Sequence, residues 1–205
     1  MISYFIYFQM VKSESVINSS YNSRLDLYAE HVIRGDITTA DGTVLAKTTV
    51  NDDGSETREY PYGRMFAHVV GYTNNGKGGL ESQYNFNLLR SHSFFLTQII
   101  NDLKNKKNIG DTLVTTLDYD VQETAYKALG DRDGAVVVME VKTGKILALV
   151  SKPDFDPNTL AERWDDIVSD ENSSVLLNRV TSGLYPPGST FKIFTTLEYV
   201  HENSN

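Results

Sequence analysis

The chain has 205 residues, of which 40% are hydrophobic and 22% charged, a composition typical of globular proteins rather than disordered ones. Its formal net charge of −8 argues against nucleic acid or an anionic membrane surface as the main partner. The absence of cysteine excludes disulfides, thiolate catalysis and cysteine-ligated zinc. The histidines lack a metal-ligand spacing, so we expect neither a metal nor a cofactor. They are His31, His68, His92 and His201.

The first eleven residues are apolar and aromatic, and Lys12 follows them. The stretch from Ile2 to Val11 is too short to span a bilayer, which needs about 20 residues. It also lacks the basic leader and the small-residue cleavage site of a signal peptide. Two interpretations are equally open: a buried strand or helix, or the outer end of a transmembrane helix.

The next hundred residues contain short predicted elements separated by turns. Asp41-Gly42 lies between short extended runs and predicts a hairpin. The stretch from Met65 to Tyr72 could form a short strand or a helical segment. After a glycine-rich loop at 74–79, we expect a helix from Leu80 to about Leu89.

From Gly110 onward the pattern is clearer. Thr112 to Leu117 is strand-like, and Asp118 to Leu129 predicts a helix that Asp118 caps. Gly134 to Val141 reads as a buried strand, and after a turn Ile146 to Val150 returns beside it. This order indicates an α+β domain entered at about residue 110.

Ser189 and Lys192 lie three residues apart near the end of the chain. At this spacing both side chains lie on one helical face, and a neighbouring base is what turns a hydroxyl into a nucleophile. About one Ser-x-x-Lys is expected by chance in this composition, so an exposed serine followed by a solvated lysine is the simpler interpretation. The preceding Pro186-Pro187-Gly188 and the apolar residues that follow favour a helix start at the serine. The pair is therefore a candidate acylating centre.

Four segments, in order along the chain, carry a resemblance to one family. They are Arg34-Gly35-Asp36-Ile37 through Asp41-Gly42 to Leu45-Ala46; Gly79-Leu80-Glu81 with Tyr84; Gly134 to Val150 followed by Phe155-Asp156-Pro157-Asn158; and Leu177-Asn178-Arg179 leading to Ser189-Thr190-Phe191-Lys192. Together they resemble the N-terminal part of a class B penicillin-binding protein, a membrane-anchored D,D-transpeptidase of bacterial cell-wall synthesis. One departure is Thr39-Ala40, where the family has Asp-Arg.

The resemblance implies an α+β fold in three parts. Residues 1–11 would be the outer end of a membrane anchor. Residues 12–110, here called the pedestal segment, would form a non-catalytic domain of the penicillin-binding protein dimerisation type. Residues 111–205, the catalytic segment, would be the incomplete start of a transpeptidase domain with a β-lactamase-like fold. The implied location is the bacterial cell membrane, with a single-pass anchor and the domains on its extracytoplasmic side.

By the same resemblance Ser189 is the nucleophile that becomes acylated by the D-Ala-D-Ala end of a peptidoglycan stem peptide, or by a β-lactam. Lys192 is the implied base, and it must be uncharged part of the time to take the proton. The backbone N–H of Ser189 would supply half of an oxyanion hole. We interpret Asn178 and Arg179 as structural. The implied protein partners are membrane proteins of cell-wall synthesis, with no role for nucleic acid.

The second and third active-site motifs of the family, Ser-x-Asn and Lys-Thr/Ser-Gly, would follow the serine helix, beyond residue 205. Lys142-Thr143-Gly144 and Ser20-Tyr21-Asn22 match these patterns by accident, because both precede the serine. We therefore expect the isolated 205-residue chain to be catalytically inactive and poorly stable in its C-terminal part.

Two other functions share some of these features. A serine β-lactamase or β-lactam sensor also carries Ser-x-x-Lys, although the pedestal-like residues 34–89 count against it. A non-catalytic cell-wall scaffold module with a vestigial serine is the alternative outside the enzymes.

Overall fold

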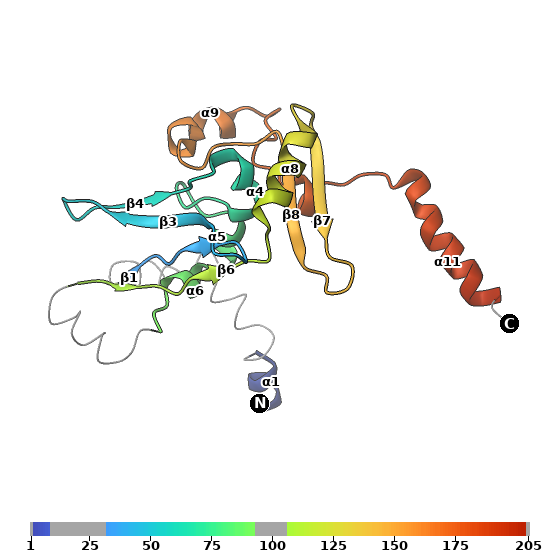
Figure 1. The fold of residues 1–205 in the computed structure, drawn as a ribbon, viewed down its shortest axis with the longest axis horizontal. Coiled ribbons are helices and arrows are strands. Elements are labelled where there is room, and N and C mark those ends of the chain that lie inside the picture. Colours follow the sequence, from blue (N-terminus) through green and yellow to red (C-terminus); the bar gives the residue numbers. More distant parts are fainter. Residues whose placement is uncertain (1, 9–31, 93–105, 204–205) are drawn as a thin grey trace.

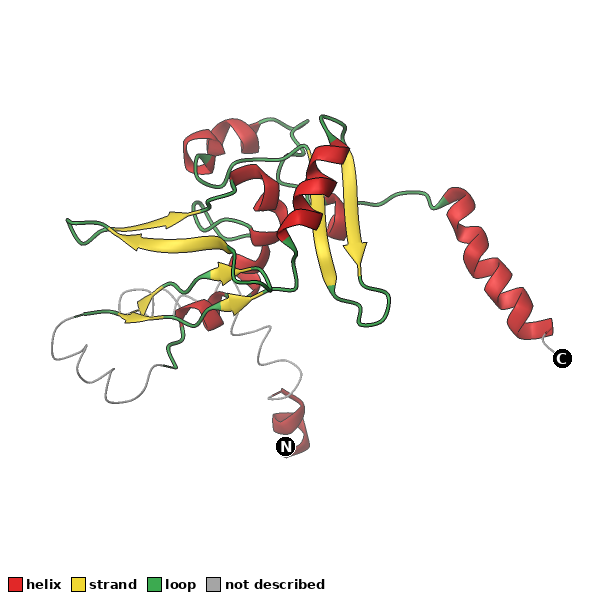
Figure 2. Ribbon diagram, viewed as in Figure 1, coloured by secondary structure: helices red, strands yellow, loops and turns green. Residues whose placement is uncertain are grey.

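The computed structural model describes residues 2–8, 32–92 and 106–203, and it mixes helices and strands in an α+β arrangement, which confirms the expected fold class (Figures 1 and 2). Residues 32–92 and 106–182, here called the body, are packed together. Residues 184–203, here called the terminal arm, extend away from the body and end in the last helix (Figure 1).

A small sheet in the order β4-β3-β2-β6, here called the pedestal sheet, takes three strands from the pedestal segment and its fourth, β6, from just beyond residue 110. Its strands are β2 (Ile37–Thr38), β3 (Val44–Val50), β4 (Glu56–Glu59) and β6 (Leu113–Val114). The β2–β3 pair is antiparallel and turns at Asp41-Gly42, so the predicted hairpin is confirmed. Gly42 has φ of 91°, a conformation that favours glycine. β6 pairs in parallel with β2, and β1 (Val32–Ile33) pairs in parallel with β5 (Asn108–Ile109).

Short helical pieces pack on this sheet. They are η2 (Gly63–Phe66), α4 (Ala67–Val70), α5 (Gly79–Gln83) and α6 (Asn85–Leu89). The stretch from Met65 to Tyr72 is thus mainly helical, not a strand. The single helix expected from Leu80 to Leu89 is in fact two, because Tyr84 leaves helical geometry with φ of −107° and ψ of 23°. Ile37, Leu45, Phe66 and Leu88 meet in the resulting core.

In the catalytic segment, α8 (Tyr119–Leu129) follows β6 and packs on the antiparallel hairpin of β7 (Gly134–Met139) and β8 (Ile146–Lys152). The Asp118 side chain accepts a hydrogen bond from the Val121 N–H at 3.0 Å, which confirms the predicted cap. The expectation of a buried β7 is only half right. Val137 and Met139 are 48% and 54% exposed, because α8 covers one face of the hairpin.

The pedestal and catalytic segments share a core. Ala67 of α4 is buried against Phe155 and Leu160, with Trp164 packed beside them. Leu160 lies in η3 (Leu160–Arg163), which leads into α9 (Trp164–Ser169), and α10 (Arg179–Ser182) follows. The boundary drawn at residue 110 stays a prediction, since β6 just beyond it belongs to the pedestal sheet.

The two ends of the chain carry the remaining helices. The terminal arm contains η4 (Gly188–Phe191) and α11 (Lys192–Asn203), and every one of its residues is exposed. Near the N-terminus lies α1 (Ile2–Tyr7). Among the described residues, no helix has the length and apolar character needed to cross a membrane. The anchor expected at residues 1–11 lies partly outside the described residues and stays a prediction.

Candidate functional site

Ser189 and Lys192 occupy the start of the last helix of the terminal arm. Ser189 lies in the tight turn η4, and Lys192 is the first residue of α11, with its backbone N–H bonded to the Ser189 carbonyl. Gly188, with φ of 55°, and the hydrogen bond from the Thr190 N–H to the Pro187 carbonyl at 3.2 Å shape the approach. A helical turn begins at the serine as expected, but it is a 3-10 turn, and the α-helix itself begins three residues later at Lys192. The catalytic roles of the pair stay a prediction.

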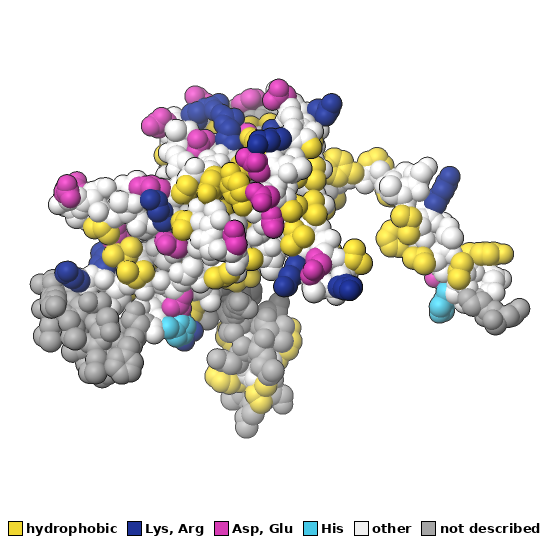
Figure 3. All heavy atoms as spheres, in the orientation of Figure 1, with side chains coloured by type: hydrophobic (Ala, Val, Ile, Leu, Met, Phe, Trp, Pro, Cys, Tyr) yellow, Lys and Arg dark blue, Asp and Glu magenta, His cyan; other side chains and the backbone are white. Residues whose placement is uncertain are grey.

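The surroundings of the pair are open. The apolar side chains of the arm face solvent instead of a core, as the hydrophobic atoms on the projecting helix show (Figure 3). Phe191 and Phe194 contact each other, with ring centroids 5.8 Å apart, and each is more than half exposed. The described residues thus form no low-dielectric pocket around the nucleophile candidate, which a preorganised acyl-transfer site requires.

Asn178 is the polar link between the pedestal segment and the approach to the arm. Its Nδ2 donates to the carbonyl of His68 in α4 at 3.1 Å. Its Oδ1 accepts from the N–H groups of Val180 and Thr181 at 3.0 and 3.4 Å, which caps α10. The Arg179 guanidinium donates to the carbonyl and hydroxyl of Ser174. These contacts agree with the structural role expected for both residues.

A buried ion cluster explains two of the sequence signatures. The Arg34 and Arg58 guanidinium groups each donate through Nε to the Glu81 carboxylate, at 2.5 and 2.8 Å, and that carboxylate is fully buried. Arg34 also donates to the Asn85 side chain at 2.5 Å. Burial lowers the pKa of Arg34, and Glu81 opposes that change. The cluster joins the strand region around Arg34 and Arg58 to helix α5, so its role is structural.

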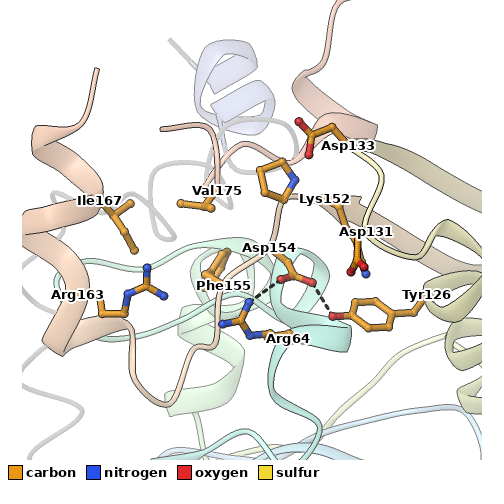
Figure 4. Close-up of a pocket in the computed structure, with 11 residues that line it drawn as sticks. Arg64, Tyr126, Asp131, Asp133, Lys152, Asp154, Phe155, Arg163, Ile167 and Val175 are labelled. Carbon is orange, nitrogen blue, oxygen red and sulfur yellow. Dashed lines mark hydrogen bonds and ion pairs between the residues drawn. The ribbon is translucent and has the colours of Figure 1, made fainter. Parts of the chain in front are cut away.

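A cavity of about 510 Å³ lies at the junction of the two segments (Figure 4). Asp154 lies at its floor, where its carboxylate accepts from Tyr126 Oη at 2.6 Å and pairs with Arg64 at 3.2 Å. Burial, together with the bond to Asp154, raises the pKa of Tyr126. Lys152 lies over the Tyr126 ring at 3.9 Å, and Arg163 enters from the other wall. No local sequence pattern indicates this network, because its members come from separate parts of the chain.

A second cavity of about 450 Å³ borders α4 and the segment around Asn178. His68 lines it and is 8% exposed, with Nε2 3.1 Å from the Pro153 carbonyl oxygen. Burial lowers the pKa of His68, while the contact with Pro153 opposes that change. Among the described residues, no cluster of three His, Asp or Glu side chains is placed to hold a metal ion.

Two family models match the chain in consecutive stretches. One, described as penicillin binding protein A dimerisation domain, matches residues 34–113. The other, described as penicillin binding protein transpeptidase domain, matches residues 134–203 and so contains Ser189 and Lys192.

Individual relatives agree with these matches. Peptidoglycan D,D-transpeptidase PbpA of Mycolicibacterium smegmatis is 37% identical over 190 residues, which cover 84% of this chain and 38% of the relative. Peptidoglycan D,D-transpeptidase MrdA of Acinetobacter baumannii is 32% identical, over 71% of this chain and 26% of the relative. The structure of penicillin-binding protein A from M. tuberculosis as an imipenem acyl-enzyme complex has a TM-score of 0.76 at 32% identity, covering 85% of this chain and 44% of that one. The chain thus spans less than half the length of each.

Proposed function

Because this chain belongs to the class B penicillin-binding proteins, we propose that it carries the nucleophile of a peptidoglycan D,D-transpeptidase. The observation that carries the proposal is the order of the two family matches: a dimerisation domain at 34–113, then a transpeptidase domain at 134–203 that includes the Ser-x-x-Lys pair. The relatives named above are peptidoglycan D,D-transpeptidases, and a β-lactam acyl-enzyme is among the similar structures.

In the proposed reaction, Ser189 Oγ attacks the carbonyl carbon between the two D-Ala residues of a stem peptide, and Lys192 accepts the hydroxyl proton. The C–N bond then breaks, the leaving nitrogen takes that proton from Lys192, the terminal D-Ala departs as a free amine, and the acyl group stays on Ser189 as an ester. An amine of a neighbouring stem peptide attacks that ester, which forms the cross-link and restores the serine. A β-lactam would follow the first half of this sequence, with its ring amide opened.

The exposed position of Ser189 has a consequence for this proposal. Charge that develops on the attacked carbonyl oxygen needs preorganised donors in a water-excluded site. Here the backbone N–H of Ser189 is one donor, and the surrounding residues 184–203 are all exposed. We therefore propose that the reaction takes place only when further parts of a transpeptidase domain cover the arm, and that the 205-residue chain alone does not form the acyl-enzyme.

We further propose the division expected from the sequence: the end of a membrane anchor at 1–11, the pedestal segment at 12–110 and the start of the transpeptidase domain at 111–205. A single-pass anchor in the bacterial cell membrane would hold both domains on the extracytoplasmic side, where stem peptides are cross-linked. Membrane proteins of cell-wall synthesis would be the protein partners.

The test uses the full gene product that contains this chain. It is incubated with a fluorescent penicillin and, separately, with the chromogenic β-lactam nitrocefin. A transpeptidase is expected to retain the fluorescent label as a long-lived acyl-enzyme and to hydrolyse nitrocefin no faster than it becomes acylated. Rapid, sustained nitrocefin turnover would instead indicate a β-lactamase. If the protein takes no label, the alternative of a non-catalytic cell-wall scaffold module is favoured instead.

A further inference from the structure

The side chain of Asn178 makes three hydrogen bonds, one to an element distant along the chain and two to the helix that follows it. Its donor bond ends on the His68 carbonyl, one of the last carbonyls of α4, which have no partner within that helix. Its two acceptor bonds fix the first N–H groups of α10. One side chain therefore caps the C-terminal end of α4 in the pedestal and the N-terminal end of α10, the helix that precedes the terminal arm.

The backbone on both sides of Asn178 is held by one buried hydroxyl of β8. Ser151 Oγ donates to the Leu177 carbonyl and accepts from the Arg179 N–H, each at 3.0 Å. Ser151 is 2% exposed, so these bonds are shielded from water. Residues 177–179 are thus fixed to the pedestal through Asn178 and to the catalytic hairpin through Ser151. This three-residue clamp has little freedom to shift on its own.

Past the clamp, α10 ends at Ser182 and the exposed arm begins. The side-chain hydrogen bonds of Thr190, Thr195 and Asn203 end on carbonyls of the arm itself. The clamp is therefore the place where hydrogen bonds to the body hold the chain before the segment that carries Ser189 leaves the body. The hydrogen bond from Asn178 to His68 joins pedestal helix α4 to the start of that segment, beside the apolar packing of Leu176 on the core cluster that contains Ala67.

We propose that Asn178 is a positioning residue for Ser189. Its side chain fixes the start of the segment that carries the nucleophile to helix α4 of the pedestal, and this restraint sets the rate of acylation. The inference rests on the proposed function. In this proposal Asn178 acts through the backbone and not on the substrate, because its side chain bonds to His68, Val180 and Thr181. Small displacements of a reacting group cost large factors in rate, so loss of the clamp is expected to slow the chemistry of correctly folded molecules.

The chain offers a matched control. Asn158 also bridges the two segments: its Nδ2 donates to the Tyr60 carbonyl at 3.0 Å, and its Oδ1 accepts from the Tyr60 N–H at 2.9 Å. It lies in the turn after β8, away from residues 177–179. Asn158→Ala thus removes two hydrogen bonds between the segments, one more than Asn178→Ala removes, without touching the clamp.

The experiment measures the second-order rate constant of acylation by a fluorescent penicillin in the full gene product, together with the labelled fraction and the melting temperature. Asn178→Ala removes the side-chain bonds to His68, Val180 and Thr181 and leaves the two Ser151 bonds in place. Asn178→Asp keeps the acceptor that caps α10 but loses the donor to His68. Both are expected to lower the rate constant by about tenfold or more, and Asn158→Ala to lower the melting temperature while the rate constant stays within about twofold.

The readouts separate positioning from damage to the fold, because unfolded molecules reduce the labelled fraction but not the rate constant of the remainder. A wild-type rate constant in Asn178→Asp, or an equal slowing in Asn158→Ala, would overturn the inference and leave the proposed function intact. If the wild-type protein takes no label, or if Ser189→Ala is still labelled, the proposed function fails and the inference falls with it. If Asn178→Ala does not fold, the acylation rate constant of Asn178→Asp tests the inference alone.

Discussion

Helices α8 and α11 have nearly the same length, 11 and 12 residues, and both carry an apolar face, yet their surroundings differ completely. α8 packs on the β7–β8 hairpin, where it buries Gln122 and Ala125. α11 buries no residue. The difference does not lie in helix propensity or amphipathic pattern. It lies in whether a partner surface is present, so a local pattern can specify a helix without specifying its packing.

The same contrast separates the body from the terminal arm as a whole. In the body, polar side chains reach across from one segment to another, as Asn158 does to Tyr60 and Gln122 to Met65. In the arm, the side-chain hydrogen bonds remain local. Substitutions in the body should therefore change the free energy of unfolding, whereas substitutions in the arm should leave it unchanged.

The largest effect is expected from the buried ion cluster. Glu81→Gln leaves two buried guanidinium groups without their carboxylate, and we expect it to lower the free energy of unfolding by about 3–5 kcal/mol. Urea unfolding followed by circular dichroism measures this. Glu59→Gln is the control, because the Lys47–Glu59 pair is exposed and should leave the midpoint nearly unchanged. Similar midpoints for the two variants would contradict the account.

A smaller loss is expected from the buried amide that joins α8 to the rest of the body. Gln122 donates to the carbonyls of Met65 and Leu149 at 2.7 and 2.9 Å, and it accepts from the Leu149 N–H at 2.8 Å. Gln122→Ala leaves these groups unpaired and should cost about 2–3 kcal/mol in the same assay. Exposed Gln83 supplies the control, Gln83→Ala. If Gln122→Ala lowers the free energy of unfolding no more than Gln83→Ala does, water replaces the amide without loss of stability and the prediction is wrong.

The pH dependence of stability provides a third comparison. Because burial lowers the pKa of His68, the unfolded chain binds a proton that the folded chain does not, once the pH falls below the ordinary value of 6.5. The free energy of unfolding should therefore decrease from that pH toward the lowered pKa of the folded state. Melting temperatures between pH 7.5 and 5 in wild type and His68→Gln would measure this. We expect a flatter profile for His68→Gln than for the wild type.

The smallest effect is expected in the arm. Leu197 is 62% exposed, so Leu197→Ala should change the unfolding free energy of the 205-residue chain by less than about 0.5 kcal/mol. Leu160 is 1% exposed in the shared core, and Leu160→Ala should cost about 2–5 kcal/mol. A large cost for Leu197→Ala would mean that α11 packs against the body after all.

Local signals predicted much of the fold. The Asp41-Gly42 turn, the cap at Asp118 and the hairpin of β7 and β8 follow from turn chemistry and periodicity over a few residues. The break at Tyr84 and the exposed face of β7 were missed. Both depend on what the tertiary structure places beside the segment, which a local pattern does not contain.

The residues of the candidate site were likewise predictable only where the signal is local. Ser189 and Lys192 could be found from their spacing, and the structure places them in consecutive turns at a helix start. The hydrogen-bond partners of Asn178 and Asp154 could not be found from local spacing, because each side chain bonds to a residue far away in sequence. The Arg34 and Glu81 segments were recognised by resemblance, but only the structure joins the two side chains as an ion pair.

The most direct test of the central claim is to map the β-lactam adduct by peptide mass spectrometry. The full gene product that contains this chain and the 205-residue chain alone are each incubated with penicillin G. We expect the adduct on Ser189 in the full product, its loss in Ser189→Ala, and no adduct on the shorter chain, whose arm is uncovered. An adduct on another residue of the full product, or equal acylation of the 205-residue chain, would contradict the account.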